Sequence, residues 1–280
     1  MKPLSDRQKN WAETHLVRGR LRTVARPAYH ALLGAQVAAA SVVSRGPESV
    51  DTSGITAVIK TFERPKACAR LIRSLQRLYP AMAIIVVDDS RDPRCIPGTR
   101  LVSLPFDSGV GAGRQAGLKQ VRTPFLLNLD DDFLLYRGTH LGAALGALTR
   151  HTRLDLVGGR VIDLPLFITH DFRGASLFAT NASPKVAPGT RFSNVEVLDK
   201  VPNFFLARTD AVRAVGWNPR LKRLDHADFF TRARGKIVSG LLEEFRVLHL
   251  RDPFDLGYRA FRDDLADDLA HLRSAFPPGR

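Results

Sequence analysis

The sequence is poor in cysteine and has no long uninterrupted hydrophobic run. Its two cysteines, Cys68 and Cys95, do not form a C-x-x-C pair, which argues against a zinc ribbon and against a disulfide framework. The most apolar stretch, residues 31–43, contains Gln36 and is shorter than the roughly 18 residues needed to cross a bilayer. It also begins too far into the chain for the apolar region of a signal peptide. We therefore expect neither a signal peptide nor a membrane anchor, and a cytoplasmic location.

Positive charge, by contrast, is abundant. The 42 Lys and Arg residues exceed the 28 Asp and Glu residues, giving a formal net charge of +14 and a pI near 10.5. Such a balance favours partners such as nucleic acid, acidic lipid head groups or phosphorylated ligands. The basic residues are spread along the chain without a nucleic-acid-binding signature. No nucleic-acid partner is therefore expected, and a general preference for arginine explains the charge equally well.

Residues 1–53 are interpreted as a basic helical arm. The first fifty residues hold eight Lys or Arg against three acidic residues, and their pattern predicts one or two helices followed by a loop at residues 44–48. A basic helix can lie on an acidic membrane surface, so peripheral membrane contact is one expectation. A solvated helix packed on the main domain is the other. The main domain is predicted over residues 54–250, and a helical tail over residues 251–280.

Strands alternate with helices in the first half of the main domain. The predicted strands are Ile55–Lys60, Ala83–Val87, Arg100–Leu104 and Pro124–Leu129, and the predicted helices are residues 64–79 and 109–121. This rhythm indicates an α/β fold with a mostly parallel sheet flanked by helices. The second half is less regular. Its predicted strands (residues 154–162, 201–208 and 245–249) and its helix (residues 226–234) are expected to add a small antiparallel sheet.

Two acidic clusters end two of the buried strands. Asp88 and Asp89 follow the second strand, and residues 130–132, which are three consecutive aspartates, follow the fourth. Adjacent carboxylates repel one another unless a cation offsets their charge, and Mg²⁺ or Mn²⁺ is held by one or two carboxylates together with phosphate oxygens. In a parallel sheet the ligand lies beyond the carboxyl ends of the strands. We therefore prefer a metal and nucleotide site to the alternatives, a solvated turn or a helix N-cap.

Six motifs together resemble those of family-2-like glycosyltransferases with the GT-A fold. They are Lys60–Pro65, Val86–Ser90, Gly111–Gly117, Leu129–Phe133, residues 154–159, and residues 201–208 continued by 218–221 and 226–230. The nearer resemblance is to the β-1,4-N-acetylgalactosaminyltransferases of the ganglioside GM2-synthase type. It covers roughly residues 54–250, and its strength lies in the order of the motifs rather than in any one of them.

This resemblance implies a UDP-sugar as donor substrate and a set of residues that bind it. The implied donor-binding residues are Thr61, Arg64, Asp88, Asp89, Arg114, Asp130, Asp131 and Gly159. Asp88 or Asp89 would accept a hydrogen bond from the uracil ring, and Arg114 would hold phosphate or base. The adjacent glycines at 158 and 159 would let the backbone approach the donor sugar closely.

The resemblance also implies a divalent metal, Mn²⁺ or Mg²⁺, held by Asp130 and Asp132 with His249 as a late ligand. An inverting transfer needs a carboxylate that takes the proton of the attacking hydroxyl. Asp228, in a His-x-acid-Phe-Phe setting, is the predicted general base, and Asp225 is its substitute. The bound metal would stabilise charge on the leaving diphosphate.

The expected function is thus metal-dependent, inverting transfer of a sugar, with an N-acetylhexosamine as the leading candidate, from a UDP donor to a glycan or glycolipid hydroxyl. Three alternatives remain open from the sequence: a binder of acidic glycans or nucleic acid, a nucleotidyltransferase, and a non-haem Fe(II) oxygenase that uses His226, Asp228 and His249. Animal members of the family lie in the Golgi lumen behind an N-terminal anchor, which is the alternative location if such an anchor is missing from this chain.

Overall fold

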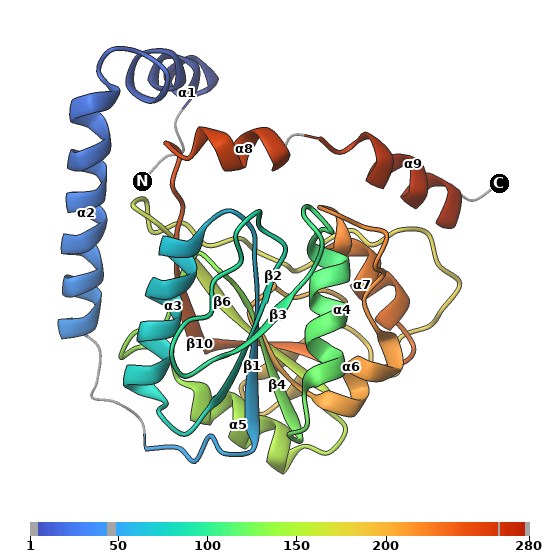
Figure 1. Cartoon of the computed structure of the whole chain (residues 1–280). Helices are drawn as coiled ribbons and strands as arrows, with labels where there is room; N and C mark the ends of the chain where they lie inside the picture. Colours follow the sequence, from blue (N-terminus) through green and yellow to red (C-terminus); the bar gives the residue numbers. More distant parts are fainter. Residues whose placement is uncertain (1–4, 44–48, 263, 278–280) are drawn as a thin grey trace.

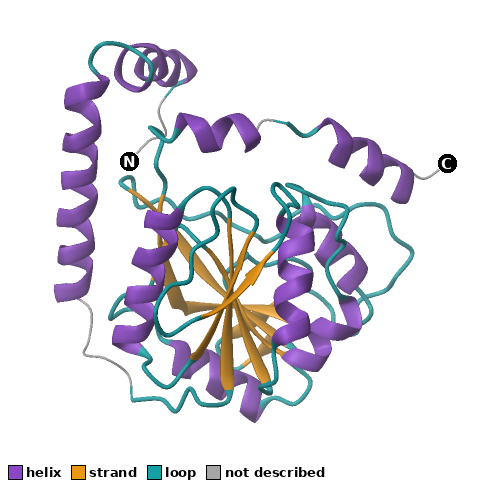
Figure 2. Cartoon of the chain, viewed as in Figure 1, coloured by secondary structure: helices purple, strands orange, loops and turns teal. Residues whose placement is uncertain are grey.

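The computed structural model describes residues 5–43, 49–262 and 264–277, and its centre is one large mixed sheet (Figures 1 and 2). The strands are β1 (Ile55–Thr61), β2 (Ala83–Asp88), β3 (Arg100–Ser103), β4 (Phe125–Asp130), β5 (Phe133–Leu134), β6 (Leu156–Leu164), β7 (Arg191–Phe192), β8 (Val195–Val197), β9 (Phe205–Arg208) and β10 (Ser239–Leu250). Their order across the sheet is β3-β2-β1-β4-β9-β6-β10-β8-β7, with β5 paired to β10.

Helices cover both faces of this sheet. They are α1 (Asp6–Ala12), α2 (Arg22–Val43), α3 (Pro65–Leu78), α4 (Val110–Gln120), α5 (Leu141–Arg150), α6 (Thr209–Val215), α7 (Asp225–Ala233), α8 (Leu256–Arg262) and α9 (Ala266–Ala275), with a π-helical turn at Glu13–Val17. α3 and α5 contribute to the core on one face. α4, α6 and α7 contribute to the core on the other face, which gives the helix–sheet–helix layering seen in Figure 1.

The side-chain alternation of β1 explains why it lies at the centre. Ile55 and Ile59 point into the core beneath α3, whereas Val58 points into the core beneath α4, because successive strand residues face opposite sides. Both faces are therefore apolar, as expected for a strand buried on both sides. Leu71 and Leu75 of α3, spaced by four residues, complete the first core.

The mostly parallel sheet flanked by helices is confirmed. β1 pairs in parallel with β2 and β4, and β6 pairs in parallel with β10. The antiparallel part is continuous with this sheet rather than a second sheet, since β9 is inserted between β4 and β6 and β8 extends the edge at β10. The predicted strand over residues 201–208 is only half formed. It begins at Phe205, because Val201 and Phe204 instead pack over β6.

The basic arm contacts the rest of the chain through α2. Leu33 of α2 is buried with Leu134 and Leu250, Tyr29 Oη donates to the carbonyl of Arg251 at 2.9 Å, and Arg22 Nη2 donates to the carbonyl of Phe254 at 2.9 Å. The predicted loop at residues 44–48 lies outside the described residues. Among the residues that are described, no helix has the length and apolar character required to span a bilayer. The division of the chain at residues 54 and 251 stays a prediction.

The tail lies across the end of the sheet at which the parallel strands finish (Figure 1). Phe261 of α8 packs edge-on against Phe62, which follows β1, with ring centroids 5.0 Å apart. The Asp268 carboxylate of α9 accepts hydrogen bonds from the backbone amides of residues 222, 223 and 224 at 2.7–3.0 Å. These contacts hold the tail beside the sheet edge where the acidic clusters lie.

Candidate functional site

The register of the sheet brings the two acidic clusters together. Thr61 at the end of β1 lies opposite Asp88 at the end of β2, and Lys60 lies opposite Asp130 at the end of β4. Residues separated by up to seventy positions in the chain therefore meet at one edge. This is the carboxyl edge of the parallel strands, where ligands bind in open α/β sheets.

Asp131 and Asp132 are held by the segment that follows β1. Thr61 Oγ1 donates to Asp131 Oδ2 at 2.7 Å, and Arg64 bridges both carboxylates, with its Nη1 2.8 Å from Asp132 Oδ2. Burial raises the pKa of Asp131 to about 6, although the charge of Arg64 opposes this. Burial acts in the same direction on Asp132, but Arg64 and His249 outweigh it and hold the pKa of Asp132 well below its usual value.

Arg114 is a second, fully buried bridge. It lies on α4 with 2% of its surface exposed and forms ion pairs with both Asp130 and Asp225. Asp130 remains the most accessible of the three consecutive aspartates, with 35% of its side chain exposed. Burial raises the pKa of Asp225 despite the opposing charge of Arg114. Arg114 thus links the start of α7 to the strand-end carboxylates.

His249 on β10 bridges two carboxylates of different strands. Its Nε2 lies 3.1 Å from Asp132 Oδ2, and its Nδ1 lies 2.7 Å from Asp163 Oδ1 on β6. Burial alone lowers the pKa of His249, but the charges of Asp132 and Asp163 raise it to about 9. Asp163 also pairs with His170 and Arg251, each at 3.2 Å. No local pattern predicts the His249–Asp163 contact, since 86 positions separate the partners.

The donor set around Asp132 fits a divalent cation. Adjacent ligands of an octahedral ion with bonds of about 2.1 Å lie roughly 3 Å apart, which matches the 3.1 Å between Asp132 Oδ2 and His249 Nε2. A metal-bound histidine is usually oriented by a carboxylate on its other nitrogen, as Asp163 does here. No group of three or more side chains placed to hold a metal ion by themselves occurs in the described part of the chain. Any such ion therefore completes its coordination with further oxygens, from a ligand or from water.

The two aspartates at the end of β2, Asp88 and Asp89, have different roles. Asp89 is fully buried, pairs with Lys60, and accepts a hydrogen bond from the backbone amide of Gly109 at 2.8 Å. One carboxylate oxygen is therefore held by Lys60 of β1 and the other fixes the start of α4. Asp88 uses Oδ1 to accept the amide of Ser90 at 2.9 Å. Two residues were predicted to contact the uracil ring. Of these, Asp88 is the one whose second carboxylate oxygen, Oδ2, is not hydrogen-bonded to another described residue.

Gly159 does not lie where a donor sugar can approach it, which corrects the prediction from the sequence. A Cβ placed on Gly159 would lie 2.5 Å from a ring carbon of Phe204 and 2.5 Å from the carbonyl oxygen of Phe245, and one on Gly158 would meet Val201 at 2.5 Å. Both glycines are needed because side chains pack directly onto β6. Their role is close packing of the core.

Asp228, the predicted general base, is held by an arginine of its own helix, and its catalytic role stays a prediction. Its carboxylate is 1% exposed and is bound by Arg232, which lies one helical turn later and donates from Nε at 2.9 Å and from Nη2 at 2.6 Å. Arg232 in turn donates to the carbonyls of Val215 and Gly216 after α6. Asp228 therefore joins α7 to α6. Asp225, the substitute candidate, is the acidic residue of α7 that reaches the site through Arg114.

The Fe(II) triad considered from the sequence is not assembled. His226 Nε2 lies 2.7 Å from the carbonyl of Val201, Asp228 is bound by Arg232, and His249 is bound by Asp132 and Asp163. The three side chains of an Fe(II) facial triad must converge on one point. These three instead face separate partners, which excludes that interpretation.

The tail supplies an aromatic cover that the motifs did not reveal. The ring of Tyr258 on α8 stacks on the guanidinium of Arg64 at 3.8 Å from the ring centroid, a cation–π contact. Burial raises the pKa of the Tyr258 hydroxyl. A donor that contacts Arg64 must therefore share this space with α8.

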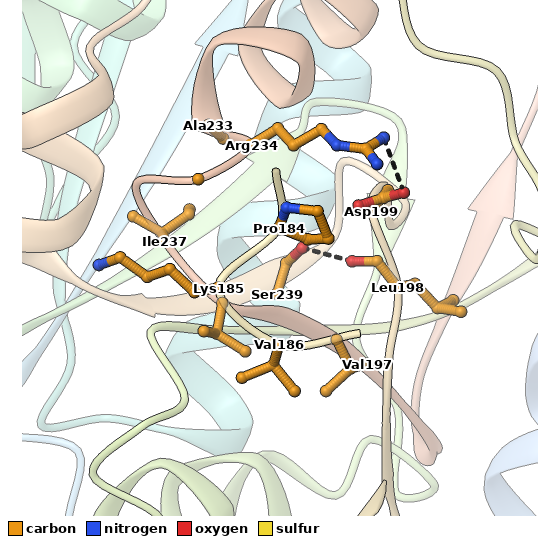
Figure 3. Close-up of a pocket in the computed structure, with 12 residues that line it drawn as sticks. Pro184, Lys185, Val186, Val197, Leu198, Asp199, Ala233, Arg234, Ile237 and Ser239 are labelled. Atoms are coloured by element: carbon orange, nitrogen blue, oxygen red, sulfur yellow. Dashed lines mark hydrogen bonds and ion pairs between the residues drawn. The ribbon is translucent and has the colours of Figure 1, made fainter. Parts of the chain in front are cut away.

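A small cavity elsewhere in the protein is not part of this site. It has a volume of about 20 Å³ and lies between α7 and the start of β10 (Figure 3). Ser239 Oγ in its wall donates to the carbonyl of Leu198 at 2.6 Å, and Arg234 pairs with Asp199 at 3.1 Å. The space suits about one water molecule. Ser239 begins β10, whereas His249 lies at the opposite end of that strand.

Comparison with known proteins identifies the sequence relatives of this fold. The model of the glycosyl transferase family 2 matches residues 56–216. The β-1,4 N-acetylgalactosaminyltransferase 1 of Rattus norvegicus is 38% identical over 207 residues, which cover 70% of this chain and 38% of that protein. The β-1,4 N-acetylgalactosaminyltransferase 2 of Mus musculus is 34% identical over 201 residues, covering 70% and 39%. The resemblance seen in the motifs is confirmed, and the chain spans about two fifths of the length of these relatives.

Solved structures confirm the fold class. The crystal structure of S. aureus TarS 1-349 superposes with a TM-score of 0.53 at 18% identity, covering 70% of this chain and 60% of that chain. The same protein in complex with UDP gives a TM-score of 0.54 at 15% identity, covering 80% and 72%. At this level of identity the likeness concerns the fold, and it agrees with the GT-A class expected from the sequence.

Proposed function

This chain belongs to glycosyl transferase family 2, and on that premise we propose that it transfers an N-acetylhexosamine from a UDP-linked donor to a glycan or glycolipid hydroxyl with inversion. The observation that carries the proposal is the meeting of Asp130, Asp132 and His249 at the carboxyl edge of the sheet. The curated relatives named as N-acetylgalactosaminyltransferases support the choice of sugar. TarS, which has been solved in complex with UDP-GlcNAc, supports the choice of nucleotide.

The donor is bound by Asp88 and by the residues that contact the acidic cluster in this structure. Asp88 accepts a hydrogen bond from the uracil ring, while Thr61 and Arg64 contact the uridine or diphosphate. Arg64 binds Asp131 and Asp132 here, and a planar guanidinium binds diphosphate oxygens in the same bidentate manner. Asp132 and His249 hold Mn²⁺ or Mg²⁺, which supplies positive charge that stabilises the departing diphosphate. Asp163 keeps the His249 ring in its orientation.

Asp225 acts as the general base in place of Asp228. During transfer the acceptor oxygen bonds to the anomeric carbon, the bond from that carbon to the diphosphate breaks, and the hydroxyl proton passes to a carboxylate. The raised pKa of Asp225 suits a group that must accept a proton. Its link to Asp130 through Arg114 ties the base to the donor-binding residues.

The first experiment measures donor hydrolysis and transfer across UDP-sugars with Mn²⁺, with Mg²⁺ and with chelator. We expect turnover of a UDP-N-acetylhexosamine that the chelator abolishes. Asp132→Ala should lose at least about 100-fold in kcat/KM, whereas Asp92→Ala, which removes an exposed carboxylate, should keep full activity. Turnover that survives the chelator contradicts the metal assignment, and absence of turnover with every UDP-sugar contradicts the donor assignment.

The second experiment separates the two acidic residues of α7. Asp225→Asn should lower kcat by about 10²–10⁴-fold, and thermal stability is measured beside it because the substitution leaves the buried Arg114 with Asp130 as its one remaining carboxylate partner among the described residues. Asp228→Asn should mainly lower thermal stability, because it leaves Arg232 without its partner. If Asp228→Asn loses turnover at unchanged stability while Asp225→Asn retains it, the base is Asp228 and our assignment is wrong.

A further inference from the structure

An open groove of about 700 Å³ lies between α2 and α3, outside the site described above. The two helices stand side by side and run in the same direction (Figure 1). The residues lining the groove are His30, Leu33, Gly34, Val37, Arg70, Arg73, Ser74, Gln76, Arg77, Leu134 and Leu250. Its volume lies within the range of about 300–1,000 Å³ that is typical of pockets for small ligands.

The floor of the groove is apolar. Leu33 and Val37 come from α2, and Leu134 and Leu250 come from β5 and β10. Leu33 is 4% exposed, so the base of the groove is a part of the protein core. Such a floor binds hydrocarbon rather than a polar ligand.

One wall of the groove is a row of arginines. Arg70, Arg73 and Arg77 follow one another along α3 at spacings of three and four residues, which places them on one side of the helix. No side-chain hydrogen bond or ion pair joins any of the three to another described residue. The buried Nε of Arg70 has no partner, although a buried donor without an acceptor costs free energy.

Among the residues that the structure describes, no acidic side chain lines the groove to neutralise these arginines. Asp252 is nearby, but it pairs with His30 at 3.4 Å, and the charges of Asp132 and Asp252 act on Arg70 only at a distance. The groove therefore combines an apolar floor with an uncompensated cationic wall. A ligand that matches both surfaces carries a hydrocarbon chain and an anionic head.

The end of α2 adds exposed apolar surface beside the groove. Val42 and Val43 are 80% and 87% exposed, and they lie at the end of α2 that points in the same direction as the end of α3 that carries Arg77 (Figure 1). Adjacent exposed apolar and basic residues are typical of surfaces that insert into an anionic lipid interface. This end is remote from Arg64, which precedes the start of α3 and reaches the acidic cluster.

We propose that the α2–α3 groove binds an anionic phospholipid, with an acyl chain on Leu33, Val37 and Leu250 and the phosphate on the arginines of α3. The match of charge and polarity argues for this occupant. A neutral lipid would leave the arginines of the wall without an anionic group, and a soluble anion would leave the apolar floor without a hydrocarbon chain. Binding holds the protein at an anionic membrane surface while the site at the sheet edge stays open.

The test is flotation of the full chain with vesicles of phosphatidylcholine alone and with vesicles that also contain phosphatidylserine. We expect binding to the second kind, weakened by salt. Each basic residue near an anionic surface contributes about fivefold, so Arg73→Glu with Arg77→Glu should weaken binding at least roughly 25-fold. Both arginines are exposed, and donor hydrolysis without vesicles should remain unchanged in this double variant.

The matched control is Arg220→Glu with Arg273→Glu, which makes the same charge change at exposed arginines elsewhere. It should bind vesicles as the unmodified protein does. Equal losses in both double variants would mean that net charge alone attracts the membrane, which overturns the groove. Equal binding to neutral vesicles, or displacement by soluble glycerophosphoserine without acyl chains, also overturns it. The second of these outcomes identifies a free phosphate compound as the ligand.

Discussion

Replacing Asp163 by asparagine tests the arrangement around His249 most directly. Asp163 Oδ1 lies 2.7 Å from His249 Nδ1, so the carboxylate fixes the ring and makes it a better electron donor. An asparagine side chain has nearly the same shape as that of aspartate but lacks the charge. Loss of such an outer partner typically weakens metal binding 10–100-fold, which corresponds to about 1.4–2.7 kcal/mol. We therefore expect Asp163→Asn to weaken Mn²⁺ binding by this factor.

The assay is calorimetric titration of Mn²⁺ into protein saturated with UDP. Asp171→Asn is the matched control, because it makes the same substitution at a neighbouring exposed carboxylate that pairs with Arg173. Identical Mn²⁺ affinities of Asp163→Asn, the control and the unmodified protein would refute the assignment of His249 as a ligand oriented by Asp163.

A second readout of the same variant needs no metal. The pKa of His249 is raised to about 9 in the folded protein, against about 6.5 in an unfolded chain. The folded state therefore holds its proton more tightly, and this stabilisation is complete below pH 6.5 and is lost as the pH rises from 6.5 to 9. In Asp163→Asn the pKa of folded-state His249 should be lower, so the loss should still begin near pH 6.5 but should be smaller and end at a lower pH. Urea midpoints of the metal-free proteins, measured from pH 6 to 9.5, check this, and superimposable profiles would contradict it.

Three further predictions concern the scaffold. Gly159→Ala should lower the free energy of unfolding by about 1–3 kcal/mol in urea denaturation, because the added Cβ meets Phe204. Gly54→Ala is the control, since open space surrounds that residue. Equal stabilities of the two variants would contradict the packing role of Gly159. Burial lowers the pKa of His226 to about 3, so on acidification the unfolded chain takes up a proton at this residue before the folded protein does. The free energy of unfolding should therefore fall as the pH drops below 6.5, by up to about 1.4 kcal/mol per pH unit. His226→Gln should reduce this fall, and an unchanged dependence of stability on pH would refute the reasoning. Asp268→Ala removes the acceptor of three backbone amides. Limited proteolysis should therefore cleave the tail of this variant at least several-fold faster than the tail of Asp267→Ala. Equal cleavage rates would contradict the role of Asp268 in holding the tail.

The sequence was sufficient for the parts of this protein that depend on local pattern. The short β-rich run over residues 55–60 and the helical spacing in residues 64–79 predicted β1 and α3 nearly to their ends. The rule that ligands bind at the carboxyl ends of parallel strands then predicted that Asp88 and Asp130 would lie near one another, which the register confirms. These inferences succeed because strand direction and side-chain period follow from the chain itself.

Tertiary structure alone decided which of the predicted residues meet. Asp225 and Asp228 lie three positions apart on one short helix, and only the fold shows that Arg114 binds the first and Arg232 binds the second. Gly159 appeared suited to a close ligand, but the neighbour that requires a glycine is Phe204.

The same limit applies to the pairing of His249 with Asp163. It follows from the register of β10 against β6, and no local pattern records which strands become neighbours across 86 residues. The sequence by itself therefore determined the elements and the edge of the sheet at which the chemistry is proposed. Packing between distant segments determined the partner of each charged side chain, because burial leaves each of them room for only a few neighbours.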